Sequence, residues 1–186
     1  GGNDMSETIL VTGASAGFGQ AICRRLVADG YRVIGSARRI DKLQALQEEL
    51  GEAFYPLQMD VTDLSQVDRE LASLPKAWER VDVLVNNAGL ALGLAPAYEA
   101  EVADWLTMIQ TNIVGLTYLT RKILPQMVER NDGYIINLGS TAGTVPYPGA
   151  NIYEASKAFV KQFSLNLRAE LAGKKIRVSN IEPGLC

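Results

Sequence analysis

Short apolar runs alternate along the chain with longer segments whose apolar residues recur on a helical period. The short runs predict strands at residues 8–11, 32–37, 53–59, 82–86, 134–138 and 176–181. The longer segments predict amphipathic helices, with stripes such as Phe18, Ile22 and Leu26, and later Phe159, Phe163, Leu167 and Leu171. This alternation predicts an α/β fold: a doubly wound parallel sheet with helices on both faces.

Two of the predicted helices have informative details. The long helical pattern from Glu101 to Arg130 contains Pro125, which predicts a kink or a break. The helix that follows the third strand has Thr62 or Asp63 as its candidate N-cap. Repeats, low-complexity tracts and linkers are absent, so we expect one domain over residues 5–186. Residues 1–4 precede Met5 and are interpreted as a cloning remnant.

Size and charge narrow the class of protein. The 186 residues suffice for one domain with a substantial core, and a net charge of −3 gives no general attraction to nucleic acid or anionic membranes. No apolar run is long enough to cross a membrane, and no signal-peptide pattern opens the chain. Cys23 and Cys186 do not form a disulfide framework. We therefore expect a cytoplasmic protein with a small-molecule ligand rather than a nucleic-acid or membrane partner.

The chain contains no histidine. This excludes Ser-His-Asp and Cys-His nucleophile systems and every metal site built on histidine, and we expect no metal. Any proton chemistry must then rest on tyrosine, lysine, serine, cysteine or carboxylate groups.

A glycine-rich turn follows the first predicted strand and opens a helix. It reads Thr12-Gly13-Ala14-Ser15-Ala16-Gly17-Phe18-Gly19. Backbone N–H groups at a helix N-terminus bind anions, and glycines, which have no Cβ, let a pyrophosphate come close to these groups. The spacing differs from the common G-x-G-x-x-G fingerprint, and no Gly-Lys-Ser/Thr of a P-loop follows. A tight packing turn is the open alternative.

Arg38 and Arg39 follow the second predicted strand, where a ribose-binding residue is expected. An acid there would accept from the ribose 2′-hydroxyl, whereas a guanidinium group binds a 2′-phosphate. The pair favours NADP over NAD as cofactor; two solvated arginines are the alternative.

Polar residues also follow the third and fourth strands. Asp60, with Val61, borders the expected ligand crevice and could accept from an adenine amino group, or it could cap the strand end. The run Asn87-Ala88-Gly89 fits a site where the backbone must lie close to a ribose, and an ordinary turn is the alternative.

Tyr153 and Lys157 share one helix face at a spacing of i, i+4. A nearby ammonium group stabilises a phenolate, which can then exchange a proton with a carbonyl or alcohol oxygen. Ser140, at the end of the fifth strand, could bond the reacting oxygen, and Asn112 lies within the long helix. Each signal alone also fits a surface pair or a buried amide.

Taken together, these motifs resemble the short-chain dehydrogenase/reductase family. The resemblance rests on Thr12-Gly13-x3-Gly17-x-Gly19, Asn86-Asn87-Ala88-Gly89, Asn112, Ser140, Tyr153-x3-Lys157 and Pro183-Gly184, and extends from about Glu7 to Leu185. It implies a Rossmann-type sheet of order 3-2-1-4-5-6, which the family completes with a seventh strand, and NAD(P) as hydride carrier.

The resemblance also implies roles for single residues. Tyr153 would be the proton donor or acceptor, and Lys157 its pKa partner and a ribose ligand. Ser140 would orient the reacting oxygen, and Asn112 would anchor a water-linked proton relay. Pro183 and Gly184 would contact the cofactor.

The residues around the motifs resemble those of the bacterial NADP-dependent 3-hydroxy acid dehydrogenase branch, for example at Gly139-Ser140-Thr141-Ala142-Gly143 and Ile181-Glu182-Pro183-Gly184. That branch oxidises serine, allo-threonine and related 3-hydroxy acids and reduces malonic semialdehyde. The family chain continues past Pro183-Gly184 with a lid, more helix and a last strand, whereas this sequence ends at Cys186. We therefore expect a sheet without its last strand, a homodimer through the helices at 101–130 and 152–172, and a tetramer in the complete protein only.

Two functions are consistent with these motifs. The leading hypothesis is an NADP-dependent oxidoreductase for a small 3-hydroxy acid. The alternative is a catalytically silent nucleotide-binding or redox-sensing module.

Overall fold

A single parallel sheet forms the centre of the molecule. The computed structural model describes residues 6–87, 89–93, 95–139 and 149–181. Its six-stranded sheet has the order β3-β2-β1-β4-β5-β6, which confirms the expected Rossmann-type order. The strands are β1 (Thr8–Thr12), β2 (Arg32–Ala37), β3 (Phe54–Gln58), β4 (Val83–Asn86), β5 (Gly133–Leu138) and β6 (Ile176–Ile181). Every predicted strand is present.

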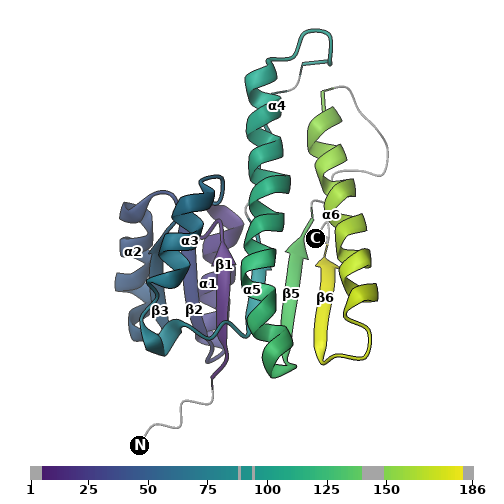
Figure 1. The fold of residues 1–186 in the computed structure, drawn as a ribbon. Coiled ribbons are helices and arrows are strands. Elements are labelled where there is room, and N and C mark those ends of the chain that lie inside the picture. Colours follow the sequence, from purple (N-terminus) through teal and green to yellow (C-terminus); the bar gives the residue numbers. More distant parts are fainter. Residues whose placement is uncertain (1–5, 88, 94, 140–148, 182–186) are drawn as a thin grey trace, which may run out of the picture.

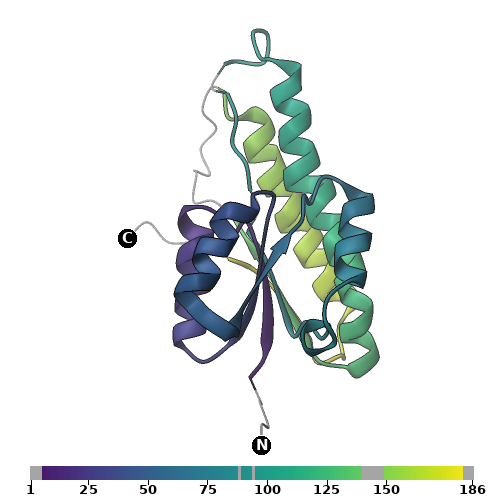
Figure 2. The same ribbon diagram turned by 90° about the vertical axis from the view of Figure 1, so that its left-hand side faces the viewer.

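Helices cover both faces of the sheet (Figure 1, Figure 2), as the alternating pattern predicts. α1 and α2 lie on one face, and α3, α5 and α6 lie on the other. The helices are α1 (Gly17–Ala28), α2 (Ile40–Leu50), α3 (Leu64–Ala72), α4 (Val102–Ile109), α5 (Leu116–Arg130) and α6 (Asn151–Glu170). Two short 3-10 turns, η1 (Gly51–Ala53) and η2 (Lys76–Trp78), precede β3 and β4, and a π-helical segment, η3 (Gln110–Gly115), joins α4 to α5. Asp63 is the N-cap of α3 and accepts a hydrogen bond from the Gln66 amide.

The two faces of the sheet have separate hydrophobic cores. Leu10 points into the core beneath α5 and α6, while its neighbours Ile9 and Val11 point into the core beneath α1 and α2. Successive side chains of a strand alternate between faces, so a strand buried on both sides reads as a continuous apolar run. This is why the strands could be located from short apolar runs.

The apolar stripe predicted for α1 is confirmed at Ile22 and Leu26, which pack against the core, but not at Phe18. In α1 the buried residues are Gly19 and Cys23, and Phe18 is 53% exposed. The glycine-rich turn packs under α1 at Gly19, and this sets the buried face of the helix.

The buried face of α6 is partly polar. It consists of Ser156, Val160, Ser164 and Leu167. Phe159 is 43% exposed and stacks on Phe163, with 6.3 Å between the ring centroids. The two serines can be buried because their hydroxyls bond to helix carbonyls. The predicted stripe is confirmed from Phe163 onward, because Phe163, Leu167 and Leu171 belong to the core or pack against it, but it missed the two buried serines.

The long helix is continuous through Pro125, so of the predicted kink or break, the break does not occur. Arg121 and Pro125 both lie on the more exposed side of the helix, where water can satisfy the Arg121 carbonyl that lacks a helical partner. The irregular part of the helix is η3, which contains Asn112. Beyond the carboxyl edge of the sheet, α4 packs against α6 (Figure 1).

Candidate active site

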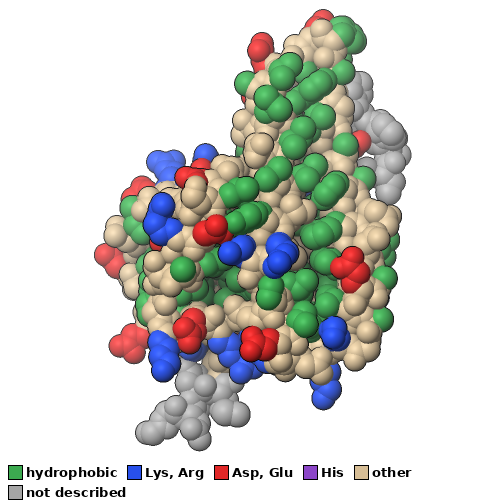
Figure 3. Space-filling model, in the orientation of Figure 1, with side chains coloured by type: hydrophobic (Ala, Val, Ile, Leu, Met, Phe, Trp, Pro, Cys, Tyr) green, Lys and Arg blue, Asp and Glu red, His purple; other side chains and the backbone are tan. Residues whose placement is uncertain are grey.

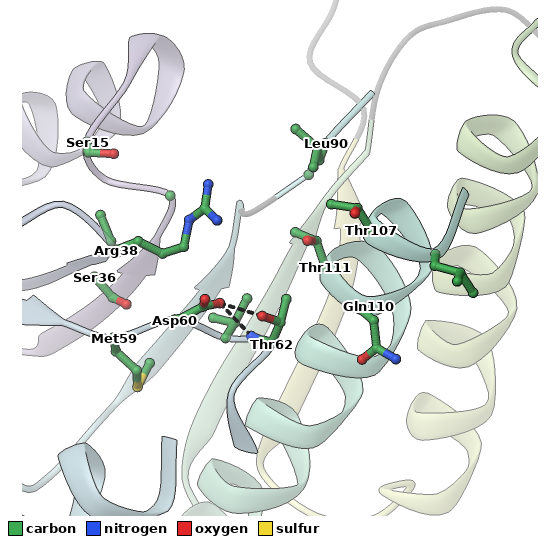
Figure 4. Close-up of a pocket in the computed structure, with 15 residues that line it drawn as sticks. Ser15, Ser36, Arg38, Met59, Asp60, Thr62, Leu90, Thr107, Gln110 and Thr111 are labelled. Atoms are coloured by element: carbon green, nitrogen blue, oxygen red, sulfur yellow. Dashed lines mark hydrogen bonds between the residues drawn. The ribbon is translucent and has the colours of Figure 1, made fainter. Parts of the chain in front are cut away.

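A cleft of about 530 Å³ opens at the carboxyl ends of the central strands. The strand order reverses between β1 and β4, and this switch point is where an open α/β sheet binds ligands. Figure 4 shows side chains from both halves of the sheet and from α4 and η3 facing this space. The lining residues are Gly13, Ser15, Ser36, Ala37, Arg38, Met59, Asp60, Val61, Thr62, Gly89, Leu90, Leu106, Thr107, Gln110 and Thr111.

The glycine-rich turn forms one wall of the cleft with bare backbone. Gly13 and Gly17 have φ angles of 63° and 43°, a region that favours glycine. A Cβ at Gly19 would lie 1.9 Å from the Gly13 carbonyl oxygen, so only glycine fits there. α1 begins at Gly17 without a side-chain cap at Ala16, which leaves N–H groups of its first turn available to an anion.

Asn87 braces the same turn from the end of β4. Its backbone N–H donates to the Thr12 hydroxyl at 2.8 Å, and its side-chain Nδ2 lies 3.5 Å from the Gly13 carbonyl oxygen. Asn87 does not line the cleft in the described part of the chain. Its observed contacts therefore hold the turn in shape.

The two arginines after β2 differ in their surroundings. Arg38 lines the cleft and extends into it, whereas Arg39 is the N-cap residue of α2 and is absent from the described lining (Figure 4). Ser36 lines the cleft two residues earlier, and its buried hydroxyl has no hydrogen-bond partner among the described residues. A cation and an unsatisfied hydroxyl beside the glycine turn fit a phosphate-bearing ligand.

Asp60 both lines the cleft and organises the strand end. Its carboxylate accepts from the Thr62 N–H at 2.9 Å and from the Thr62 hydroxyl at 2.7 Å. Its own N–H donates to the Gln66 side chain at 2.6 Å. Beside it, Val61 packs tightly on η3, since a Cβ at Gly115 would lie 2.9 Å from Val61 Cγ2.

Tyr153 and Lys157 lie together on α6, as their spacing predicts. The Lys157 Nζ is 5.4 Å from the centroid of the Tyr153 ring, within the range of a cation–π contact. Burial lowers the pKa of Lys157 below its usual value. A Cβ at Gly89 would lie only 2.9 Å from this Nζ, so the ammonium group abuts the cleft wall at Gly89.

Asn112 holds the segment that follows Gly89. Its Oδ1 accepts from the Leu90 N–H, and its Nδ2 donates to the Leu90 carbonyl, both at 2.8 Å. The same Nδ2 lies 3.3 Å from the Ser156 hydroxyl on α6. The π-helical segment thus places a buried amide between the cleft wall and the helix that carries Tyr153 and Lys157.

A second buried polar cluster, the Asn86 network, lies beneath the cleft. The Asn86 side chain donates to Asn137 Oδ1 at 2.7 Å and approaches the Thr120 hydroxyl at 3.3 Å. Asn137 in turn donates to the Ser164 hydroxyl at 2.9 Å. These four buried side chains connect β4, β5, α5 and α6.

The structure brings most of the predicted site residues to one edge of the sheet. Ser140, Ala88, Pro183 and Gly184 lie outside the described residues. The other predicted residues lie around the cleft but outside its described lining: Gly17, Phe18, Gly19, Arg39, Asn87, Asn112, Tyr153 and Lys157. Sequence reasoning missed Ser36, although the two-residue period of a strand places it on the same side as Arg38. It also missed the wall from α4 and η3, formed by Leu106, Thr107, Gln110 and Thr111.

Within the described ranges, no helix is long and apolar enough to cross a membrane. The same residues contain no cluster of three or more potential metal ligands.

Comparison with known proteins gives consistent matches over almost the whole chain. The family model for short chain dehydrogenase matches residues 7–186. A probable NADP-dependent dehydrogenase from Haemophilus influenzae is 60% identical over 181 residues, covering 97% of this chain and 72% of the relative. The NADP-dependent 3-hydroxy acid dehydrogenase YdfG from Salmonella typhi is 59% identical over 177 residues, 95% of this chain and 71% of that protein. The closed form of serine dehydrogenase complexed with NADP+ superimposes with a TM-score of 0.92 at 57% identity, covering 96% of this chain and 72% of that one.

Proposed function

This chain belongs to the short-chain dehydrogenase family. We propose that it is an NADP-dependent oxidoreductase. Its substrate would be a small 3-hydroxy acid such as serine or allo-threonine, or the matching carbonyl compound such as malonic semialdehyde. The observation that carries this proposal is the position of Lys157, which lies over Tyr153 and abuts Gly89 at the cleft wall. This arrangement sets an acid–base group beside a nucleotide-sized cleft.

The residues of the cleft fit NADP. The Gly13–Gly19 turn offers N–H groups and no Cβ atoms to a pyrophosphate, and Arg38 with the unpartnered Ser36 hydroxyl suits a 2′-phosphate. Asp60 and Val61 would border the adenine. When bound, the cofactor supplies or accepts the hydride, and the protein supplies binding and orientation.

The proton chemistry falls on Tyr153. The phenol hydroxyl would donate a proton to the substrate oxygen during reduction and accept it during oxidation. Lys157, with its Nζ 5.4 Å from the centroid of the Tyr153 ring, is assigned as the charged partner of this tyrosine. Asn112 holds the Leu90 segment beside this pair, and we assign Ser140 as the residue that orients the reacting oxygen.

The experiment compares wild type with Tyr153→Phe. Wild type should oxidise NADPH with malonic semialdehyde and reduce NADP with serine. Tyr153→Phe removes only a hydroxyl, so NADP binding should persist while turnover falls by about 10²–10⁴-fold. Tight NADP binding by wild type without turnover on a panel of 3-hydroxy acids would favour the silent module, which no observed feature of the site supports over an enzyme.

We also propose a homodimer in the cytoplasm. Val102 on α4 and Phe159 and Leu165 on α6 are exposed apolar residues on neighbouring helices. Figure 3 shows hydrophobic side chains along the surface formed by α4 and α5. Leu119 on α5 is fully buried in the core and is not available to a partner. A cytoplasmic location would give the enzyme access to the intracellular NADP pool.

A further inference from the structure

Ser156 is a fully enclosed serine within the site. It is 0% exposed and has no place in the described lining of the cleft. Its hydroxyl donates to the Tyr153 carbonyl oxygen at 2.7 Å and lies 3.3 Å from Asn112 Nδ2, from which it accepts. Both the donor and the acceptor capacity of this hydroxyl are therefore used by groups of the site.

The contact to Asn112 closes a ring of interactions. Asn112 is bonded to both polar backbone groups of Leu90, and the preceding residue, Gly89, lies against the Lys157 ammonium group. Lys157 directly follows Ser156 on α6. The ring therefore runs from the Lys157 ammonium group to Gly89, along the chain to Leu90, through hydrogen bonds to Asn112 and Ser156, and along the chain back to Lys157.

In such a ring the position of the ammonium group depends on every contact. Without the Ser156 hydroxyl, the Tyr153 carbonyl would lose a donor and Asn112 Nδ2 would lose an acceptor. We propose that Ser156 is a positioning residue, which holds α6 against the Asn112–Leu90 pair and thereby fixes Lys157 relative to Tyr153. This inference rests on the proposed function, because it concerns how the same acid–base pair is arranged.

The surroundings of Lys157 make its position measurable. Burial is the cause that lowers its pKa, and no charged neighbour on β4, α4 or η3 contributes to that shift in the described chain. The titratable group that faces it is Tyr153, at 5.4 Å on its own helix. The acid of α4, Asp104, has its carboxylate beside Gly93. If the ring opens and water reaches the ammonium group, the pKa of Lys157 must rise.

The same helix provides a matched control. Ser164 is also buried, donates to the Val160 carbonyl at 2.8 Å and accepts from Asn137. Replacing Ser164 removes an equivalent pair of hydrogen bonds that does not involve Asn112, Tyr153 or Lys157. A structural loss common to buried helix serines would therefore affect both positions equally.

The experiment compares Ser156→Ala, the similarly sized Ser156→Cys and the control Ser164→Ala with wild type. For each we would measure stability by urea unfolding, kcat and KM, the pH profile of turnover, and the titration of Lys157 by NMR with isotope-labelled lysine, assigned with Lys157→Met. In Ser156→Ala we expect kcat to fall about tenfold with little change in KM, as for a slightly misplaced catalytic group. The pKa of Lys157 and the alkaline limb of the profile should both move up by about half a unit.

Ser156→Cys should show the same shifts in smaller degree, and Ser164→Ala should lose stability with the profile unmoved. Equal pH profiles and equal Lys157 titrations in Ser156→Ala and Ser164→Ala would overturn the proposal. If wild type shows no turnover, the proposed function fails, yet the NMR titration still decides the role of Ser156. A Lys157 pKa that rises only in the Ser156 variants would then support positioning without catalysis.

Discussion

At the scale of single residues, Arg38 and Arg39 show how neighbours in sequence can differ in function. Arg38 lines the cleft beside Ser36, whereas Arg39 begins α2 outside the described lining. Arg38→Ala should weaken NADP binding by about tenfold or more, because a charge-assisted hydrogen bond contributes about 1.5–3 kcal/mol. NAD, which has no 2′-phosphate, should bind almost unchanged. Calorimetric titration with both cofactors measures the difference.

The adjacent Arg39→Ala is the control, since it removes the same charge from the same loop. It should change NADP affinity less than Arg38→Ala does. Equal losses for NADP and NAD in Arg38→Ala would contradict a 2′-phosphate contact, and a larger loss in Arg39→Ala would reassign it.

The sequence predicted the residues whose chemistry or spacing is unusual. Tyr153 and Lys157 could be paired from their helical spacing, and Gly19 could be selected from its place in the turn. Ser156 and Thr111 could not be selected, because serine and threonine are common and their role depends on packing, whereas Ser36 could have been found from the two-residue period that places it on the same side as Arg38. Ser156 became informative only when its two hydrogen bonds linked α6 to Asn112.

At the scale of elements, the turn between β1 and α1 depends on contacts that a Cβ would destroy. A Cβ at Gly19 would fall 1.9 Å from the Gly13 carbonyl oxygen and 2.8 Å from Asn87 Nδ2. Gly19→Ala should displace the turn, cost about 1–3 kcal/mol of unfolding free energy and abolish measurable NADP binding. Urea unfolding and a cofactor titration on the same sample test both effects.

Gly30→Ala is a suitable control for this element. Gly30 has a φ of 94°, and beyond its own chain neighbours nothing would lie within 4 Å of an added Cβ, so the substitution strains the backbone without a clash. It should lower stability and leave NADP affinity of the folded protein intact. A Gly19→Ala protein that binds NADP normally would show that the turn can relax.

The elements themselves were predictable to different degrees. Parallel strands with two buried faces produced clear apolar runs, and Asp63 marked the start of a helix as its cap. The π-helical segment η3 had no such signal, because its irregularity arises from tertiary contacts: Gly115 packs against Val61 and Asn112 binds Leu90. Pro125 does not break the helix, since its position on the more exposed side leaves the helix continuous.

At the scale of the whole molecule, Cys23 links stability to pH. Cys23 is on the buried face of α1, and this burial raises the pKa of its thiol from 9.0 to about 12. Above pH 9 the unfolded chain releases this proton while the folded chain retains it, so the free energy of unfolding should fall as pH rises from 9 to 12. Denaturant unfolding of wild type against Cys23→Ala isolates this contribution, which should vanish in the variant. Parallel pH curves for the two proteins would contradict it.

Assembly is the other property of the whole molecule. Light scattering should report a dimer, and Val102→Glu combined with Leu165→Glu should yield monomers, because charges at an apolar contact oppose association. Tyr31→Glu, a change at another exposed apolar residue away from α4 and α6, should leave the dimer intact. A stable tetramer, or a dimer unaffected by the double change, would contradict the proposed contact.

The Asn86 network has a consequence for how this sequence can diverge. Any single apolar replacement within it leaves a buried partner without one of its hydrogen bonds. Ser164→Ala, for example, would leave an Asn137 N–H unpaired, and an unpaired buried polar group costs about 1–3 kcal/mol. Replacing the whole set by apolar side chains of matching shape could be nearly neutral. Descendants of this chain are thus separated from an all-apolar version by intermediates of low fitness, so the four positions should change together or not at all over evolutionary time.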